Sequence, residues 1–126
     1  EWRTQQTVSR LLQKYYKAQP DGIPGNDDCG TMSAWALFSM MGLYPDCPGS
    51  PYYTLTTPVF SKVTLHLDPR YYPDGDIVIT TDRTSPSQLY IGSMTLGGKR
   101  LSGYRVSHKQ LVEGRILDMR LKKSLY

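Results

Sequence analysis

A helix predicted from Cys29 or Gly30 to Met41 constrains the fold more than any other segment, because its apolar side chains cover nearly the whole circumference. A helix that is apolar all round must be covered all round. One amphipathic helix and one sheet face would cover only about two of its sides and leave a sticky patch. We therefore expect this chain to be part of a larger protein or to pair with another chain. The apolar positions are Met32, Ala34, Trp35, Ala36, Leu37, Phe38, Met40 and Met41.

The spacing of apolar residues changes near residue 50, from the helical period to an alternation of two. Residues 2–17 are predicted as an amphipathic helix that ends before Pro20. Gly42 is predicted to end the second helix in a left-handed conformation. The proline-containing segment 46–51 predicts a stiff connector. We expect residues 1–50 and residues 51–126 to form two separate units.

Short strands are predicted throughout the second unit. Gly97-Gly98 indicates a hairpin turn, and Ser107 with Gln110 forms the capping box of a short helix that should end at Gly114. Five or six short strands at this spacing indicate an antiparallel sandwich, so the predicted fold class is α+β. The expected strands are Tyr53–Thr57, Lys62–Leu67, Asp76–Thr81, Tyr90–Leu96, Lys99–Leu101 and a last one around Leu117, Met119 and Leu121.

The composition of the 126 residues is globular and sufficient for a real core. The net charge is +4, but basic residues cluster only at Arg120, Lys122 and Lys123, so we predict no nucleic-acid partner. No apolar run is long enough to cross a bilayer, so no membrane span is predicted. The chain lacks an initiator Met and a charged-then-apolar leader, and we therefore expect a processed or excised segment.

The cysteine and histidine positions do not favour a zinc site. Cys29 and Cys47 form no Cys-x-x-Cys pair, and the histidines are distant from both in sequence. The two thiols could form a disulfide or stay free as buried, small apolar side chains. We expect His66 on an exposed strand face and His108 on a short surface helix, and neither belongs to the candidate site.

Two adjacent carboxylates, Asp27 and Asp28, stand between a Gly- and Pro-rich loop and the apolar helix. A helix start presents unpaired backbone N–H groups and a positive dipole end, which stabilise a carboxylate there. One interpretation is structural, with one of the two residues as the helix cap. The other is an active-site carboxylate, because one cap needs only one Asp and the loop 21–25 suits a fixed backbone shape. The residues alone leave both interpretations open.

With this loop and the order of helices and strands, the chain resembles the C-terminal end of glycoside hydrolase family 92, the calcium-dependent, exo-acting α-mannosidases of bacteria. The most specific stretch runs from Asp21 to Trp35. The resemblance implies that the two helices come from the end of an (α/α)6-type catalytic barrel. The other similar runs are Trp2–Gln5, Gly42–Pro45, Cys47–Ser50, Pro58–Val63, Tyr90-Ile91, Leu96–Lys99, Ser107-His108 and Gly114–Ile116.

The resemblance also implies a reaction, the inverting hydrolysis of terminal α-linked mannose, α-1,2-linked in particular, in glycans. Such a reaction needs one carboxylic acid for the leaving oxygen and one carboxylate that activates water. The resemblance places this base at Asp28 first and Asp27 second, with Asn26 as a substrate-binding residue. The general acid and most calcium ligands would lie upstream, so the chain alone should be inactive and its full-length parent active. We expect a periplasmic, secreted or cell-surface location.

Two other functions fit parts of the sequence. The predicted sandwich could be a carbohydrate-binding or scaffolding module, with the helical pair as its linker. Alternatively, the strongly apolar helix could mark an unrelated dimeric interaction domain. Calorimetry with mannobiose and light scattering on the isolated chain distinguish these possibilities from the catalytic one.

Overall fold

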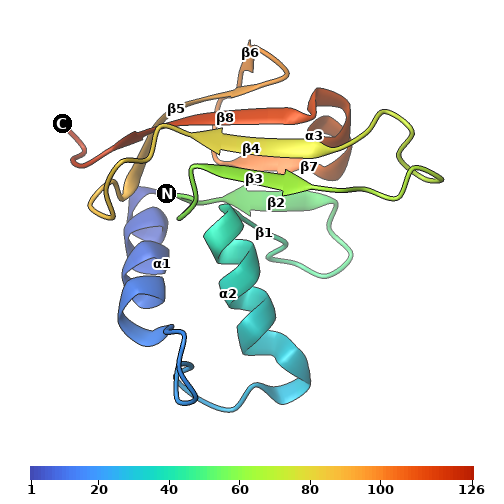
Figure 1. Cartoon of the computed structure of the whole chain (residues 1–126). Helices are drawn as coiled ribbons and strands as arrows, with labels where there is room; N and C mark the ends of the chain where they lie inside the picture. Colours follow the sequence, from blue (N-terminus) through green and yellow to red (C-terminus); the bar gives the residue numbers. More distant parts are fainter.

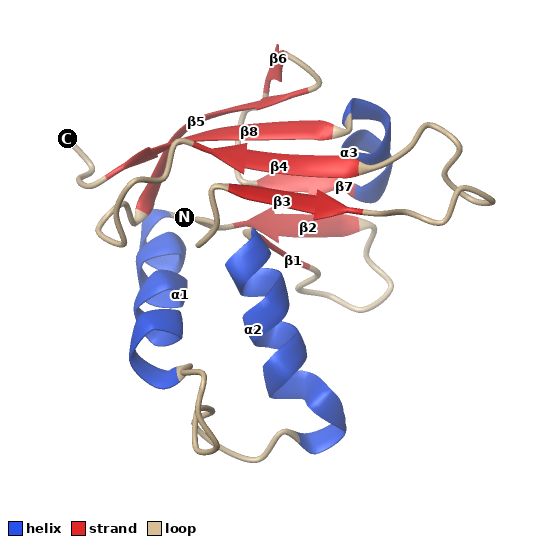
Figure 2. Cartoon of the chain, viewed as in Figure 1, coloured by secondary structure: helices blue, strands red, loops and turns tan.

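The computed structural model describes all 126 residues and has an α+β architecture, which confirms the predicted class. Two helices extend side by side from one side of the β-sheets, and a third short helix lies at another end of the sheets (Figures 1 and 2). The elements, in chain order, are α1 (Trp2–Tyr15), η1 (Asp28–Gly30), α2 (Thr31–Met41), β1 (Leu43–Tyr44), β2 (Tyr52–Leu55), β3 (Lys62–Leu65), β4 (Ile77–Thr81), β5 (Tyr90–Leu96), β6 (Lys99–Arg100), β7 (Arg105–Ser107), α3 (His108–Gly114) and β8 (Ile116–Lys122).

The first helix, α1, is joined to the sheet by polar side chains on its buried face. Gln5 is 2% exposed, and its Oε1 accepts a 2.9 Å hydrogen bond from the backbone N–H of Ile91 in β5. The register of β5 shifts between Ile91 and Ser93, so Gln5 pairs a backbone donor next to an irregularity in the ladder. The helix ends at Tyr15, earlier than expected, because Tyr16 has extended backbone angles.

The second helix, α2, confirms the predicted apolar helix and its stop signal. It ends at Gly42, which has a φ of 88°. A Cβ atom at this position would lie 2.5 Å from Cγ of Pro58, so both the backbone angle and the packing require glycine. The α-helix begins at Thr31, after the predicted start, because Cys29 and Gly30 both have positive φ angles. No helix of the chain combines the length and hydropathy that spanning a membrane requires.

The strands form a three-stranded sheet with the order β1-β2-β7 and a five-stranded sheet with the order β3-β4-β8-β5-β6. All neighbouring strands are antiparallel except β4 and β8, which are parallel. This parallel pair departs from the expected all-antiparallel arrangement. It is possible because β5, β6, β7 and α3 intervene in the chain and provide a long crossover between β4 and β8.

Both sheets contribute to one hydrophobic core. Its residues include Leu55 and Val106 from the smaller sheet, Ile79 and Met119 from the larger sheet, and Leu111 from α3. Val106 and Met119 are fully buried, at 0% exposure. The core therefore ties the two sheets and α3 into one unit.

Several local predictions in the strand region are confirmed. Gly97 and Gly98 connect β5 to β6, with φ angles of 57° and 77°. Both hydrogen bonds of the Ser107–Gln110 capping box are present at the start of α3. Two strands, β1 and β7, were not expected, because two or three residues are too few to show an alternating pattern. The strand β1 precedes the connector but pairs with β2, which follows it. The division of the chain into two units at residue 50 stays a prediction.

Candidate functional site

The loop between α1 and α2 has the fixed backbone that its composition indicated. The N–H of Lys17 donates to the carbonyl oxygen of Gly22 at 2.9 Å, and the N–H of Gly22 donates to the carbonyl oxygen of Gln19 at 2.9 Å. A Cβ atom on Gly22 would lie 1.8 Å from the Lys17 oxygen, so no other residue fits there. This closed turn leads the chain toward Asn26, Asp27 and Asp28.

The structure gives the two adjacent aspartates different environments. Asp27 is half-buried, and its Oδ1 accepts a 2.9 Å hydrogen bond from the backbone N–H of Ser33. Its Oδ2 accepts a short hydrogen bond from the Ser33 hydroxyl. Ser33 is the third residue of α2, so Asp27 pairs one of the donors that a helix start leaves free. The N-cap residue of α2 is Gly30, so Asp27 is not the cap residue itself, but its carboxylate pairs a backbone donor of the first helical turn as the structural interpretation required.

The hydrogen bonds from Ser33 keep Asp27 charged. The side-chain hydrogen bond from the Ser33 hydroxyl, followed by the backbone one, lowers the pKa of the Asp27 carboxyl below its ordinary value. The charge in turn affects Tyr16 at the end of α1. Burial, and then the negative charge of Asp27, raise the pKa of the Tyr16 hydroxyl. Tyr16 and Asp27 are therefore close enough to influence each other electrostatically.

Asp28 is exposed, and its carboxylate has no hydrogen-bond or salt-bridge partner in the chain. Its backbone is held, because the Thr31 hydroxyl donates to the Asp28 carbonyl oxygen at 2.7 Å. The next residue, Cys29, is left-handed, with φ 55° and ψ 24°, and Gly30 continues with a φ of 72°. Asp28 thus presents a free carboxylate from a fixed backbone, as a group that takes a proton from a water molecule must.

The neighbouring candidate residues are also accessible. Asn26 is exposed, as a residue that contacts a substrate would be. Cys29 and Cys47 are both free, so the disulfide alternative does not hold. The expectation that free thiols would be buried is wrong, because Cys29 lies in the exposed turn and Cys47 in the exposed connector.

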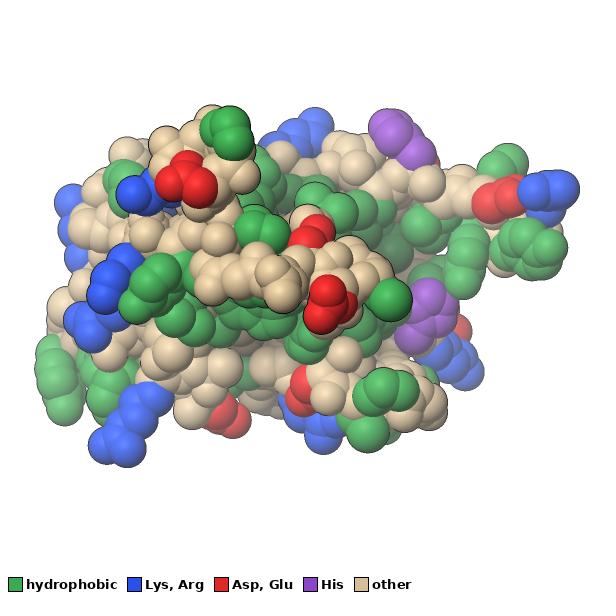
Figure 3. Space-filling view, turned by 90° about the horizontal axis from the view of Figure 1, so that it is seen from below, with side chains coloured by type: hydrophobic (Ala, Val, Ile, Leu, Met, Phe, Trp, Pro, Cys, Tyr) green, Lys and Arg blue, Asp and Glu red, His purple; other side chains and the backbone are tan.

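Aromatic and apolar residues border this site. The Tyr16 and Trp35 rings pack with centroids 5.4 Å apart, so Trp35 is half-buried between the helices rather than enclosed. An adjoining cavity of about 370 Å³ is lined by residues that include Tyr16, Ile23, Ser33 and Leu37. Figure 3 looks onto the helix ends and shows hydrophobic and acidic side chains together on this face.

Each of the three adjacent tyrosine pairs, Tyr15-Tyr16, Tyr52-Tyr53 and Tyr71-Tyr72, has one exposed and one half-buried member. Tyr15, Tyr52 and Tyr71 are exposed, at 41%, 43% and 73%, whereas the second tyrosine of each pair is half-buried. Two of the inner partners, Tyr53 and Tyr72, each form a 3.1 Å hydrogen bond with His108. His108 is therefore half-buried between two hydroxyls instead of decorating the surface. The exposed His66 pairs with Asp76 at 2.8 Å.

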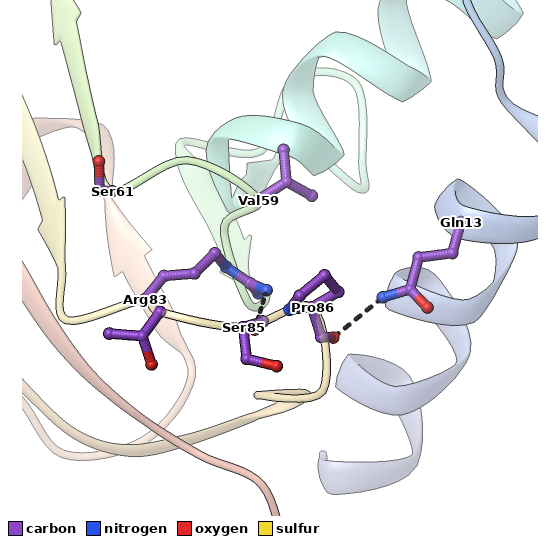
Figure 4. A pocket seen from close by; sticks show the side chains of 7 residues that line it. Gln13, Val59, Ser61, Arg83, Ser85 and Pro86 are labelled. Atoms are coloured by element: carbon purple, nitrogen blue, oxygen red, sulfur yellow. Dashed lines mark hydrogen bonds between the residues drawn. The ribbon is translucent and has the colours of Figure 1, made fainter.

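A second cavity, of about 440 Å³, lies between α1 and the loops that follow β2 and β4 (Figure 4). Arg83 lines this cavity, and its guanidinium donates to the carbonyl oxygens of Pro58, Ser85 and Gln88 at 2.7, 3.0 and 3.1 Å. Burial lowers the pKa of Arg83. Gln13 closes the other side by donating to the Pro86 carbonyl oxygen at 3.1 Å. These hydrogen bonds indicate that Arg83 has a structural role and holds the conformation of the loop after β4.

The chain contains no cluster of the side chains that most often bind metal ions. No group of three or more His, Cys, Asp or Glu side chains lies close enough together to hold an ion. Asn26 and Asp28 are oxygen donors of the type that calcium prefers, but calcium takes six to eight oxygen ligands. A calcium ion near this loop would need most of its ligands from elsewhere.

The sequence predicts the candidate site on this one loop, but it does not assign Ser33 or Tyr16 a role there. The signal for Ser33 is its position as the third residue of the helix, where the backbone N–H needs an acceptor. Tyr16 could not be found from spacing, because its contact with α2 depends on how the two helices pack.

Known proteins similar to this chain are glycoside hydrolases. The sequence model of the glycosyl hydrolase family 92 catalytic domain matches residues 1–123. An uncharacterized secreted glycosidase of Arthroderma benhamiae is 31% identical over 105 residues, which make up 81% of this chain and 13% of that protein.

Solved structures agree with this match. A family GH92 α-mannosidase from Bacteroides thetaiotaomicron, in complex with mannoimidazole, has a TM-score of 0.87 at 29% identity. A family GH92 inverting mannosidase from the same organism has a TM-score of 0.85 at 34% identity. Each likeness covers 98% of this chain but only 16% of the other protein. The chain therefore spans a small part of the length of the relatives it matches.

Proposed function

The chain belongs to glycosyl hydrolase family 92, and we propose that it supplies the general base of a larger, exo-acting α-mannosidase. One observation supports this most directly. The structure leaves the carboxylate of Asp28 exposed and without a partner, on a backbone held by its neighbours. The family match spans both the helices and the sheets, which favours a catalytic part over a separate carbohydrate-binding or scaffolding module.

In the proposed reaction, Asp28 accepts a proton from a water molecule. The water oxygen bonds to the anomeric carbon of a terminal mannose as the glycosidic C–O bond breaks. A carboxylic acid from another part of the parent enzyme protonates the leaving oxygen. Acid and base lie roughly 6.5–9.5 Å apart in inverting enzymes, on opposite faces of the sugar. Asp27 adjoins Asp28 in sequence and therefore cannot be that acid.

Two other parts of the proposal concern the substrate and the metal. The exposed amide of Asn26 is proposed to hydrogen-bond a sugar hydroxyl. We propose that the parent enzyme binds calcium to engage and distort the sugar, with most ligands outside this chain. The lack of a three-residue metal-binding group within the chain supports that placement of the ligands.

We further propose that the enzyme acts with inversion and cleaves α-1,2 linkages during glycan degradation. We also propose that it is a bacterial enzyme that is secreted or periplasmic. The description of one relative as an inverting mannosidase supports the stereochemistry. The description of another as a secreted glycosidase supports the location. Without the general acid, the isolated chain should not release mannose.

The test uses the full-length enzyme and the isolated 126-residue chain side by side. We expect the full-length enzyme to release mannose from α-1,2-mannobiose, faster than from other linkages, with β-mannose as the first product seen by NMR. Release of mannose by the isolated chain would contradict the proposed division of the acid and base. First formation of α-mannose would contradict the role of Asp28 as a base.

A further inference from the structure

Both carboxylate oxygens of Asp27 are already engaged in hydrogen bonds within the chain. Its Oδ1 accepts the Ser33 backbone N–H at 2.9 Å, and its Oδ2 accepts the Ser33 hydroxyl. These hydrogen bonds stabilise the charged form of the carboxylate. A base that must collect a proton needs an accessible oxygen within hydrogen-bond reach of the water. The contacts of Asp27 therefore indicate a structural role, in which its carboxylate anchors the loop to the start of α2.

The contact between Asp27 and Ser33 closes a short ring of backbone, residues 27–33, which contains Asp28. Within this ring, the N–H of Gly30 donates to the Asp27 carbonyl oxygen at 2.9 Å. The Thr31 hydroxyl donates to the Asp28 carbonyl oxygen at 2.7 Å. The hydrogen bonds that the backbone N–H and the hydroxyl of Ser33 donate to the Asp27 carboxylate fasten the ring across its open end.

The ring contains a conformation that needs such support. Cys29 has a φ of 55°, which is unfavourable for a residue with a side chain. Strained backbone conformations persist where the surrounding contacts determine them, and they are concentrated at functional sites. Hydrogen bonds from Gly30, Thr31 and Ser33 close this turn, whereas the carboxylate of Asp28 is exposed and has no partner in the chain.

Building on the proposed role of Asp28 as the general base, we propose that Asp27 and Ser33 are a positioning pair. They hold the left-handed Cys29–Gly30 turn, and the turn fixes the direction in which Asp28 presents its carboxylate. The proton from water goes to Asp28, and none goes to Asp27. Asp27 is therefore a positioning residue and not a second base.

The experiment measures kcat and KM of the full-length enzyme with Asp27→Asn, Ser33→Ala and the double substitution. We expect each single variant to lower kcat by about 10- to 100-fold with KM unchanged, because a small misplacement of a catalytic group has effects of this size. The double variant should be no worse than the worse single variant, because both substitutions disrupt the same Asp27–Ser33 contact. The matched controls are Asp74→Asn and Ser102→Ala, exposed positions without side-chain partners, and these should leave kcat unchanged.

Azide separates a missing base from a misplaced one. In Asp28→Ala, azide should restore turnover of 2,4-dinitrophenyl α-mannoside. The azide nitrogen bonds to the anomeric carbon as the C–O bond breaks, dinitrophenolate leaves, and β-mannosyl azide forms without any proton transfer. In Asp27→Asn and Ser33→Ala the base is still present, so azide should have no effect. Thermal melting identifies a temperature at which every variant is folded. Ser33→Ala is the milder variant of the pair, because it keeps the hydrogen bond from the Ser33 backbone N–H to Asp27.

The outcomes separate this inference from the proposed function. Azide rescue of Asp27→Asn, together with a loss as large as that of Asp28→Ala, would make Asp27 a base and overturn the positioning pair. Full activity in both Asp27→Asn and Ser33→Ala would also overturn it. Full activity of Asp28→Ala would instead reject the proposed base. The expected pattern is azide rescue for Asp28→Ala alone, with reduced and coupled kcat values for the pair.

Discussion

The sheets and the paired helices of this chain bury their apolar side chains to very different extents. In the sheets, Val106, Leu117 and Met119 are fully buried, at 0% exposure. In the helices, Leu37 is 57% exposed and Leu11 is 37% exposed. The helix ends carry hydrophobic side chains on the surface (Figure 3). The sheets thus complete their core within the chain, whereas the helices leave apolar surface that the chain does not cover.

The candidate site lies in the incompletely covered region. Asp28 is exposed at the start of α2, away from the shared core of the sheets. The contrast suggests a division of tasks, with the sheets as a stable support and the helix ends as the part that joins other structure. The predictions that follow challenge or refine this contrast, beginning with the largest expected effect.

The largest effect is expected at the helix end. In the full-length enzyme, Asp28→Ala should lower the rate of mannoside hydrolysis by about 10²- to 10⁴-fold, because the variant loses a general base. Steady-state kinetics measures this loss, and circular dichroism should show an unchanged fold. A rate close to that of the unaltered enzyme would show that the open end does not carry the reaction.

The next largest effect is expected in the sheets. Leu117→Ala should lower the free energy of unfolding by about 2–5 kcal/mol, because it leaves a cavity in the completed core. Leu117 lies in β8, between β4 and β5, and is 0% exposed. Urea denaturation followed by fluorescence provides the measurement. A cost below about 1 kcal/mol would indicate a loose core.

A smaller effect is expected where the helices meet the sheets. Gly42→Ala should destabilise the chain by about 1–3 kcal/mol, because a left-handed backbone is costly for alanine. The added Cβ would also approach Cγ of Pro58 to 2.5 Å. The same denaturation experiment applies, with Gly98→Ala as a matched control. Gly98 also has a positive φ, but nothing lies within 4 Å of its Cβ position, so the difference between the two variants isolates the contact with Pro58.

A still smaller effect is expected on the open apolar surface. Leu37→Ala should change the stability of the chain by no more than about 0.5 kcal/mol, because the side chain is largely exposed. In the full-length enzyme, where we expect the surface to be covered, the same variant should cost more. Equal costs in the two proteins would mean that other structure does not cover Leu37, which would undermine the contrast between the regions.

The smallest effect is a pH dependence at the start of α2. The hydrogen bonds from Ser33 lower the pKa of Asp27 in the folded chain. Their stabilising contribution is therefore present above the unfolded carboxyl pKa of about 4 and is lost as the pH falls through the lower folded value. Hydrogen exchange of the Ser33 amide should accelerate over that range, beyond its intrinsic pH dependence. Asp27→Asn should remove the extra acceleration, and its persistence in that variant would assign it to another group.

Much of the fold could be predicted because its signals are local. The stop at Gly42, the Gly97-Gly98 hairpin and the Ser107 capping box each depend on a few adjacent residues. The short strands β1 and β7 and the parallel pairing of β4 with β8 depend on distant contacts and could not be predicted in this way.

The candidate site shows the same limit at the level of single residues. The residue pattern left two interpretations of the adjacent carboxylates open, a helix cap and an active-site group, and it did not separate Asp27 from Asp28. The structure separates them, because the left-handed angles of Cys29 and Gly30 bring Asp27 to Ser33 and leave Asp28 exposed.

The sequence by itself determined most of the helices and strands and the loop that carries the carboxylates, because helix periodicity, turn residues and caps act over a few positions. The tertiary structure alone decided which apolar side chains are enclosed, how the two sheets share a core, and which aspartate is free. Those outcomes depend on contacts between segments far apart in the chain, and a local pattern contains no information about them.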